Sequence, residues 1–280
     1  MHERKAMDYT IEKGKITVLG SEFFDPQATL ECGQLFRYKK TEDGYVVFAL
    51  NHKAEVKKEG NNVIIYTNSE YFFEKYFDLR RNYGIIVSEL SDKSLIPAQA
   101  EYGKGIRILN QDPLETLFSF IISANNNIPR IKGILERIVE GLGEKADGFY
   151  AFPTAEKLAS AGESFYRSVG AGYRAAYLDK TAKAIAGGFD LEKVYDMSTD
   201  EARKYLYRLT GVGPKVCDCI LLFAYHKTDT FPVDTWIKKV FVDIFGYETT
   251  PKEMSEKLLE KFGNLSGYAQ QYLFYYKRGQ

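Results

Sequence analysis

The stretch LTGVGPKVCDCILLFAYHKTDTFPVD, residues 209–234, decides how this chain folds. Gly211 and Gly213 form a turn in front of an apolar helix, and such a turn presents backbone N–H groups that can hold an anion. Pro214 suits the first helical position, where its missing N–H would have no partner anyway. We therefore expect a helical hairpin with an anion site at its turn.

Lys215 and Asp234 give the hairpin a possible chemistry. Lys215 lies on the first turn of the helix, where the dipole disfavours a charged amine, and a neutral amine can act as a nucleophile. Asp234, nineteen residues later, precedes the amphipathic stretch TWIKKVFVDIF, so it can cap that helix and point back at the amine. The alternative is a plain hairpin whose lysine is a solvated surface charge.

The composition is that of an ordinary globular protein. The chain has 280 residues, 45% apolar and 27% charged, with 21 Tyr and 19 Phe for a core and for stacking on bases. No apolar run approaches the length of a membrane span, and the N-terminus MHERKAMDYT lacks a signal-peptide core. We expect a cytoplasmic protein with no membrane partner.

Charge and cysteine content limit the classes of function that this protein can have. The net charge is zero, which argues mildly against nucleic-acid binding. The segment from Ala202 to Val240, however, contains seven Lys or Arg and three Asp, which gives it a local charge of +4. Three cysteines, Cys32, Cys217 and Cys219, cannot build a four-cysteine iron–sulfur site. We expect reduced thiols and no metal or cofactor.

Hydrophobic patterns divide the chain near residue 95 and predict an α+β fold. Residues 1–95 hold short β-prone runs separated by turn signals, which indicate an antiparallel sheet: KITVLG, LFRYKK, YVVFAL, AEVKK and NVIIYT. A helix is expected in SEYFFEKYF. Residues 96–280 are a mostly helical, two-lobed region, in which Asp112-Pro113 and the Ser198–Glu201 capping box begin helices.

Five segments, in the same order, resemble the 8-oxoguanine DNA glycosylase family of the helix-hairpin-helix-GPD superfamily. They are ECGQLFRY (31–38), QDPLETLFSFIISANNNIPRIKGILERI (111–138), GAGYRAAYL (170–178), the stretch 209–234 and GYAQQYLF (267–274). The resemblance implies a glycosylase and abasic-site lyase that acts as a monomer on duplex DNA containing 8-oxoguanine, associated with the nucleoid. It implies that the hairpin, about residues 199–225, grips a phosphate through Gly211 and Gly213, that Lys215 attacks the sugar and that Asp234 assists.

The resemblance also implies DNA contacts in residues 125–130 and 173–174. Asn125 would enter the duplex to fill the hole left by an extruded base, with Arg130 reading the orphaned partner and Arg174 as the second candidate reader. Tyr173, exposed at a helix start by glycines, would wedge between bases. The competing interpretations are a helix cap and turn for the asparagines, solvated arginines and a core tyrosine.

A base pocket is implied by four further residues. Gln270 and Phe274 lie four apart on the last helix, so that Phe274 offers a stacking face and Gln270 an amide for the pairing edge. Cys219, one turn beyond Lys215, would form the other wall. The Gly33 carbonyl would accept the N–H that 8-oxoguanine has and guanine lacks. Without the resemblance, Phe274 and Cys219 are simply core residues and Gly33 marks a turn.

Two positions depart from the family pattern, and two rival functions remain. Trp236 stands where eukaryotic members have histidine, which puts the support of Asp234 and a phosphate contact in doubt; Thr210 replaces a frequent proline with little consequence. The rivals are a glycosylase for another lesion, alkylated or pyrimidine, and a non-catalytic DNA-binding module. The absent iron–sulfur cysteines favour the oxidised-purine branch, and a module would not need the lysine–aspartate pair.

Overall fold

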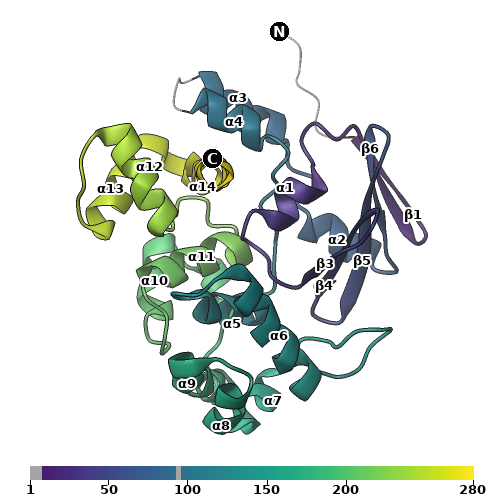
Figure 1. Cartoon of the computed structure of the whole chain (residues 1–280), viewed down its shortest axis with the longest axis vertical. Helices are drawn as coiled ribbons and strands as arrows, with labels where there is room; N and C mark the ends of the chain where they lie inside the picture. Colours follow the sequence, from purple (N-terminus) through teal and green to yellow (C-terminus); the bar gives the residue numbers. More distant parts are fainter. Residues whose placement is uncertain (1–7, 93–95) are drawn as a thin grey trace. The chain divides into compact units, whose positions relative to one another are not determined.

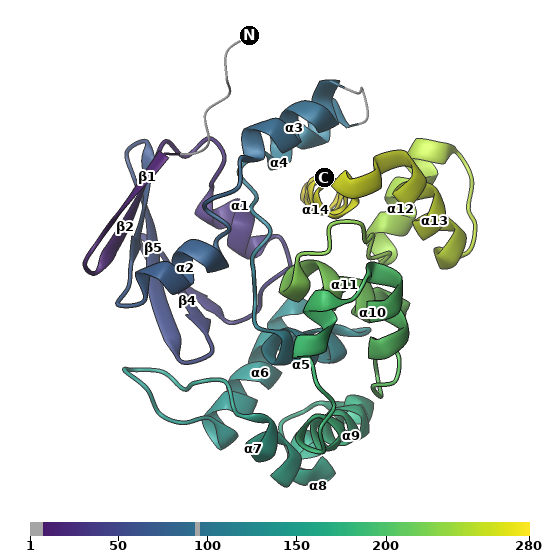
Figure 2. The ribbon, with the colours of Figure 1, turned by 180° about the vertical axis from the view of Figure 1, so that it is seen from behind.

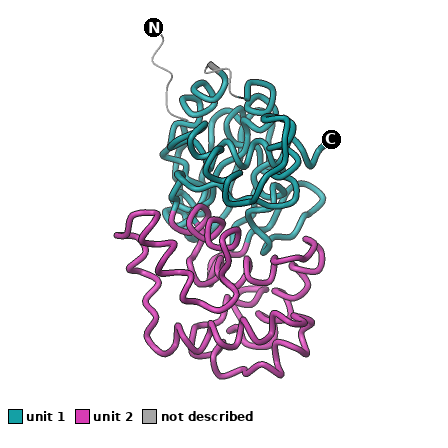
Figure 3. The backbone as a smooth tube through the Cα atoms, turned by 90° about the vertical axis from the view of Figure 1, so that its left-hand side faces the viewer, with its two compact units in different colours: residues 1–47, 53–110, 226–280 teal, residues 48–52, 111–225 magenta. Residues whose placement is uncertain are grey.

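The computed structural model describes residues 8–92 and 96–280 and divides the chain into two compact units. Unit 1 comprises Met1–Val47, Lys53–Asn110 and His226–Gln280, and unit 2 comprises Phe48–His52 and Gln111–Tyr225 (Figure 3). In the described residues the last strand ends at Tyr66 and the elements that follow are helices, and unit 1 joins segments from both ends of the chain.

A six-stranded antiparallel sheet in the order β1-β2-β6-β5-β4-β3 confirms the predicted sheet (Figure 1). Its strands are β1 (Asp8–Glu12), β2 (Lys15–Leu19), β3 (Tyr38–Lys40), β4 (Gly44–Ala49), β5 (His52–Glu59) and β6 (Asn62–Tyr66). Ile16 and Val18 are fully buried and pair with the fully buried Ile65 and Val63, while Lys15 and Thr17, which alternate with them in β2, are half-buried. The period-two pattern in KITVLG thus places one face of the sheet in the core.

Unit 1 also contains helices from three parts of the chain. They are α1 (Pro26–Glu31), α2 (Glu70–Tyr76), α3 (Tyr83–Asp92), α4 (Pro97–Gly103), α12 (Thr235–Phe245), α13 (Pro251–Phe262) and α14 (Ser266–Gly279). Figures 1 and 2 both place α2 alongside the sheet, where it contacts β2. The C-terminal helix α14 packs against α4, α12 and α13.

Unit 2 is helical apart from the tip of the β4–β5 hairpin. Its elements are α5 (Pro113–Ser123), α6 (Ile128–Leu142), α7 (Ala155–Ser160), α8 (Gly162–Ser168), η1 (Gly172–Arg174), α9 (Ala175–Ala186), η2 (Glu192–Asp196), α10 (Thr199–Leu206) and α11 (Pro214–Tyr225). Asp112 caps α5 as predicted, and burial raises the pKa of its carboxyl to about 6. The predicted capping box of Ser198 and Glu201 begins α10. α5 packs against α11, so two helices far apart in sequence share a core.

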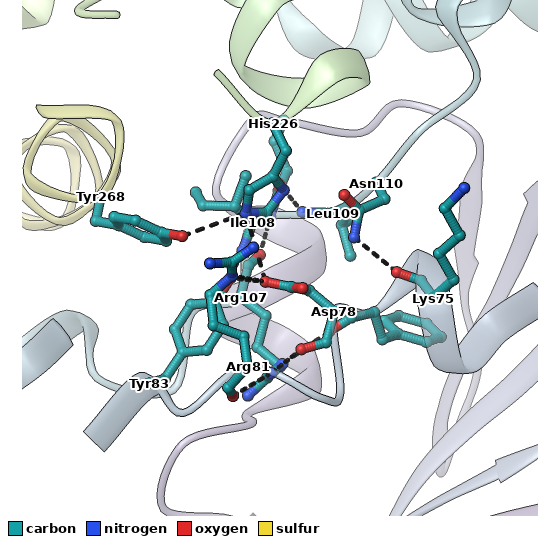
Figure 4. Close-up of polar contacts among 12 residues, drawn as sticks. Lys75, Asp78, Arg81, Tyr83, Arg107, Ile108, Leu109, Asn110, His226 and Tyr268 are labelled. Carbon is teal, nitrogen blue, oxygen red and sulfur yellow. Dashed lines mark hydrogen bonds and ion pairs between the residues drawn. The ribbon is translucent and has the colours of Figure 1, made fainter. Parts of the chain in front are cut away.

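A fully buried arginine organises the centre of unit 1 (Figure 4). The Arg107 guanidinium donates to four backbone carbonyls, those of Phe23, Phe77, Asp78 and Arg81, and lies 4.0 Å from the ring centroid of Tyr83. A buried charge is costly unless hydrogen bonds satisfy it, and these carbonyls do so. Arg107 therefore fixes the loop between α2 and α3.

His226 connects this cluster to α14 (Figure 4). Its Nε2 lies 3.2 Å from the hydroxyl of Tyr268, on α14, and 3.4 Å from the Asp78 carboxylate. The backbone N–H of Gly267 donates to the carbonyl of Thr228 close by. Within unit 1, the segment that follows α11 in the chain thus holds the start of α14 in place.

None of the described helices has both the length and the apolar character that crossing a membrane requires. Within residues 8–92 and 96–280, no three His, Cys, Asp or Glu side chains gather closely enough to hold a metal ion.

Candidate active site and nucleic-acid interface

Lys215 occupies the first turn of α11, as the sequence predicts, and its amine has two neighbours in unit 2. Nζ lies 3.3 Å from the Ser123 hydroxyl at the end of α5 and 5.1 Å from the ring centroid of Phe120. The side chain is half-buried. Because a serine and an aromatic ring confine it, this amine is not the freely solvated charge of the alternative interpretation.

The turn before α11 is tight because it contains Gly211. Gly211 has φ +88°, and a Cβ there would come within 2.9 Å of the Cβ of Tyr177 on α9. The Thr181 hydroxyl donates to the Thr210 carbonyl at 2.8 Å, which ties the turn to the same helix. The first N–H groups of α11 have no partners within the helix and point out of this turn. The arrangement has the geometry of an anion site.

The helical hairpin itself is fixed by a buried ion pair. Arg203 on α10 donates through Nε to the Asp218 carboxylate on α11 at 2.8 Å, and both side chains are largely shielded from solvent. α10 and α11 span Thr199–Leu206 and Pro214–Tyr225, which coincides with the hairpin expected at about residues 199–225. The pair links α10 to α11 on the two sides of the turn.

Two of the three asparagines after α5 use their side chains to hold the turn and the next helix. Asn126 donates to the Ile122 carbonyl, and the Asn127 side chain caps α6 by accepting from the Arg130 N–H. Asn125 instead has φ +50° and is exposed. The cap-and-turn interpretation therefore holds for Asn126 and Asn127, while Asn125 presents its amide to solvent.

Arg174 and Tyr173 meet Asn125 on the same surface of unit 2. Arg174 is only 4% exposed, and its guanidinium donates to the carbonyls of Ala124 and Asn125. Tyr173 is 51% exposed and lies over the Arg174 guanidinium, 4.4 Å from the ring centroid. In this structure Arg174 holds the Asn125 turn in place rather than reaching outward. Tyr173 is a surface residue, not a core tyrosine.

Arg130 lies on the first turn of α6 and is exposed. Its Nη2 donates to the Gly170 carbonyl at 3.3 Å, just before the segment that carries Tyr173. The structure thus brings Asn125, Arg130, Tyr173 and Arg174 onto neighbouring segments of one unit.

In unit 1, Asp234 is the N-cap of α12, as predicted. Its Oδ1 accepts from the backbone N–H groups of Trp236 at 3.0 Å and Ile237 at 2.8 Å, and the residue is half-buried. Trp236 therefore supports Asp234 through its backbone N–H and not through its side chain. Its ring lies 4.8 Å from the Lys239 amine.

The predicted base-binding residues of unit 1 are also close together. Gly33 has φ +86° in the loop after α1, and a Cβ there would lie 3.2 Å from the Cε1 atom of Phe274. Gln270 lies one turn earlier on α14 and is 5% exposed. Its Oε1 is buried without a hydrogen-bond partner within the described residues, which is uncommon for a buried acceptor.

The three cysteines are buried free thiols. Burial raises the pKa of Cys32 to about 11 and that of Cys217 to about 12, so both stay protonated at neutral pH. Cys219 is 3% exposed on α11, one turn after Lys215.

Sequence reasoning missed three neighbours of these residues. Ser123 and Phe120 contact the Lys215 amine across 92 and 95 positions of sequence, and no local pattern links them. Arg278 packs beside Gly33 and Phe274. Its spacing of four from Phe274, on the face that Gln270 and Phe274 share, is the signal that would have found it.

Comparisons with known proteins identify the family of this chain. The model of the 8-oxoguanine DNA glycosylase N-terminal domain matches residues 16–117, and that of the HhH-GPD superfamily of base excision DNA repair proteins matches residues 118–264. A probable N-glycosylase/DNA lyase of Methanothermobacter thermautotrophicus is 34% identical and covers 75% of this chain and 73% of its own. The N-glycosylase/DNA lyase OGG1 of Arabidopsis thaliana is 31% identical and covers 88% of this chain and 75% of its own.

A solved structure is similar over nearly the whole chain. The 8-oxoguanine glycosylase/lyase of Clostridium acetobutylicum, in complex with double-stranded DNA containing cytosine opposite 8-oxoguanine, is 41% identical with a TM-score of 0.92. The match covers 98% of this chain and 99% of that one. The two family models match consecutive parts of the sequence, and the chain therefore belongs to the 8-oxoguanine DNA glycosylase family of the helix-hairpin-helix-GPD superfamily.

Proposed function

We propose that this chain is a bifunctional DNA repair glycosylase that excises 8-oxoguanine from duplex DNA and then cleaves the strand at the abasic site. The observation that carries the proposal is the confined amine of Lys215 at the start of α11, beside a hairpin turn with the geometry of an anion site. The family relation supports the substrate, because similar proteins are N-glycosylase/DNA lyases and 8-oxoguanine glycosylases.

Lys215 acts as the nucleophile. Its nitrogen forms a bond to the anomeric carbon of the extruded nucleotide, and the bond to the base breaks, so that the electron pair leaves with the base. The nitrogen gives a proton to the departing base, and its lone pair then breaks the bond between the anomeric carbon and the ring oxygen. The ring oxygen takes a proton, and the opened sugar is left joined to the lysine as a protonated Schiff base. This cation acidifies the neighbouring sugar proton, and loss of that proton expels the 3′ phosphate by β-elimination. The Ser123 hydroxyl, 3.3 Å from Nζ, orients the amine.

Asp234 supplies a fixed negative charge for the positive charge that develops at the sugar. Two backbone N–H groups hold its Oδ1, so the carboxylate keeps one orientation during the reaction. A charge that needs no reorganisation stabilises a transition state more than a mobile one does.

Four residues recognise the base. The Gly33 carbonyl accepts the N7 hydrogen of 8-oxoguanine, Phe274 and Cys219 enclose the ring, and the unpartnered Oε1 of Gln270 serves the pairing edge. Guanine has no hydrogen at N7, so it would leave the Gly33 carbonyl unpaired. Sites built on such hydrogen bonds reject the analogue that lacks the donor.

Four residues of unit 2 hold the opened duplex. Exposed Asn125 enters the space that the base leaves, exposed Tyr173 wedges beside it, and Arg130 reads the orphaned base. Arg174 keeps the Asn125 turn in shape through the carbonyls of Ala124 and Asn125. A phosphate binds at the turn of Gly211 and Gly213. We further propose a monomer acting on the nucleoid in the cytoplasm, since one chain supplies every residue assigned here.

A borohydride trapping experiment tests this function. Wild-type protein incubated with a duplex containing 8-oxoguanine should release the base, cut the strand and form a covalent adduct when borohydride is present. Lys215→Gln should bind the same duplex but form neither product nor adduct, because an amide cannot attack the sugar. Lys157→Gln, at an exposed lysine of α7, is the matched control and should retain all three activities.

The outcomes separate the rivals. Binding by the wild type without any adduct would indicate a non-catalytic DNA-binding module. Adducts on an alkylated or oxidised pyrimidine, but not on 8-oxoguanine, would indicate a different lesion. Repeating the assay with each of the four bases opposite 8-oxoguanine establishes the opposite-base preference.

A further inference from the structure

Three side chains form a row on α14, and two of them, Phe274 and Arg278, lie beside Gly33. Gln270, Phe274 and Arg278 follow one another at intervals of four residues, so they share one face of the helix. A Cβ at Gly33 would lie 3.2 Å from Phe274 Cε1 and 3.5 Å from Arg278 Nη1. The guanidinium is 5.5 Å from the ring centroid of Phe274. The ring and the guanidinium therefore both approach the α-carbon of Gly33.

Two polar atoms in this row are buried without hydrogen-bond partners within residues 8–92 and 96–280. They are Oε1 of Gln270, an acceptor, and Nη1 of Arg278, a donor. Leaving such groups unpaired costs stability, and native proteins rarely do so without a functional reason. Phe274 lies between them in the row. The row thus offers an acceptor at one end, an aromatic ring in the middle and a donor at the other end.

The Arg278 guanidinium also has no carboxylate partner in the part of the chain that the structure describes. Its Nη2 donates to the backbone carbonyl of Glu31. The Glu31 carboxylate accepts instead from Lys40 and from the Tyr45 hydroxyl. The neighbouring cation on α14, Lys277, pairs with Asp243 at 2.7 Å. Arg278 is therefore anchored at one nitrogen and keeps its charge and its second nitrogen for another group.

The chemistry of 8-oxoguanine matches this arrangement. Its five-membered ring carries an N–H donor at position 7 directly beside a carbonyl acceptor at position 8, whereas guanine has an acceptor at position 7 and a C–H at position 8. A protein edge that reads the lesion needs an acceptor next to a donor. The Gly33 carbonyl group and Arg278 Nη1 are such a pair on adjacent segments.

We propose that Arg278 is a further specificity-determining residue, whose Nη1 donates to the position-8 oxygen of the extruded base while the Gly33 carbonyl accepts the N7 hydrogen. The proposal rests on the proposed function. Gln270 and Arg278 are eight residues apart, about 12 Å along the helix axis, so they reach opposite ends of a purine stacked on Phe274. Gln270 serves the pairing edge and Arg278 the edge that oxidation alters.

The test compares two lesions that differ only at the atom that Arg278 contacts. 8-Oxoguanine and 8-thioguanine both carry the N7 hydrogen, but the sulfur of 8-thioguanine is a poor acceptor. Single-turnover base release is measured for wild type, Arg278→Met and Arg278→Lys on both lesions and on a preformed abasic site. Lys277→Met removes a charge from the same helix and is the matched control. Thermal unfolding confirms that each variant folds.

Arg278→Met should slow release of 8-oxoguanine roughly 10- to 100-fold, the range for a lost hydrogen bond to a charged group. Its effect on 8-thioguanine should be about threefold or less, and cleavage of the abasic site should stay within twofold of wild type. Arg278→Lys should recover part of the 8-oxoguanine rate. Lys277→Met should resemble wild type on every substrate.

Two results would overturn the proposal. Equal losses on 8-oxoguanine and 8-thioguanine would mean that Arg278 only positions the Gly33 loop through the Glu31 carbonyl. An unchanged rate on 8-oxoguanine for Arg278→Met would mean that the guanidinium makes no contact that assists base release. Failure of the wild type to release 8-oxoguanine would remove the proposed function and this proposal together, whereas the first two results leave that function standing.

Discussion

At the scale of single residues, several side chains combine a structural contact with a proposed chemical task. Asp234 caps α12 through Oδ1 and is assigned the charge that stabilises the sugar cation. These two tasks use different properties of the side chain, because the cap needs an oxygen acceptor and the chemistry needs a negative charge. Substitutions can therefore separate them.

Asp234→Asn should fold normally and bind lesion DNA, because the amide oxygen still accepts from the N–H groups of Trp236 and Ile237. Its single-turnover rate should fall about 100- to 1,000-fold, since the stabilising charge is lost. Asp234→Ala should show the same slow chemistry and also lose about 1 kcal/mol of folding stability. An Asn variant with the wild-type rate would show that Asp234 is only a helix cap.

Phe274→Ala should weaken 8-oxoguanine excision by about 1–3 kcal/mol, the usual scale for stacking of a base on an aromatic ring. Cleavage of a preformed abasic site should be unaffected, because no base remains to be stacked. The check is the ratio of the two single-turnover rates. Equal loss on both substrates would indicate that the ring mainly supports the Gly33 loop, which it contacts in this structure.

Residue-level prediction from sequence worked where the relevant spacing lies within one helix. The positions of Lys215 on α11, Asp234 before α12 and Gln270 with Phe274 on α14 follow from local periodicity and capping rules. The contact of Lys215 with Ser123 joins residues 92 apart, and that of Arg278 with Glu31 joins residues 247 apart. Only tertiary packing creates those contacts, and local sequence rules do not contain it.

At the scale of elements, the strong patterns gave the sheet and the long helices, and the short elements were missed. The first strand, β1, reads DYTIE and has only half-exposed and exposed residues, so it shows no buried face to a hydrophobicity pattern. α1 is six residues long, too short for a helical period to emerge. Its cap, Asp25 followed by Pro26, was the available signal.

The hairpin turn gives a prediction at this scale. Gly211→Ala should destabilise the protein by about 1–2 kcal/mol, because φ is +88° and the added Cβ would come within 2.9 Å of the Tyr177 Cβ. Affinity for DNA should fall to a similar degree with and without the lesion, since phosphate contacts position a protein without reading bases. Fluorescence anisotropy with both duplexes measures this.

Gly213→Ala is the matched control for stability. A Cβ at Gly213 would meet nothing within 4 Å, and its φ is not in the left-handed region. Thermal unfolding should therefore show a smaller loss for Gly213→Ala than for Gly211→Ala. Equally small losses would mean that the turn tolerates a side chain at both positions and that Tyr177 moves aside.

At the scale of the whole molecule, the chain builds unit 1 from both of its ends. The sequence pattern changes at about residue 95, but the segment His226–Gln280 packs with the N-terminal segments in unit 1. Composition cannot reveal this, because the C-terminal helices have the same amphipathic pattern as those of unit 2. A polar cluster joins these segments, and it consists of Arg107, Asp78, Tyr83, His226 and Tyr268 (Figure 4). Nothing in the sequence indicates that these loop and helix residues lie together.

His226 makes this cluster sensitive to pH. Burial lowers the pKa of its imidazole to about 4, against an opposing attraction from Asp78 and with repulsion from Arg81 and Arg107. The unfolded chain has an imidazole pKa of about 6.5. Between these values the unfolded state binds a proton that the folded state does not, so stability is full above pH 6.5 and falls as the pH drops toward 4.

His226→Asn should therefore be less stable than wild type at pH 7, and this deficit should shrink by about 2 kcal/mol at pH 5. Asparagine does not titrate and tolerates the left-handed backbone at this position, where φ is +53°. Urea unfolding of both proteins from pH 7 to pH 5 gives the difference, in which acid effects of the shared carboxylates cancel. Parallel stability curves would show that the imidazole has the same pKa in the folded and unfolded states. A deficit that grew as the pH fell would show that the imidazole is charged in the fold, held by Asp78 at 3.4 Å. Asp78 would then form a second ion pair beside the one with Arg81 at 2.6 Å.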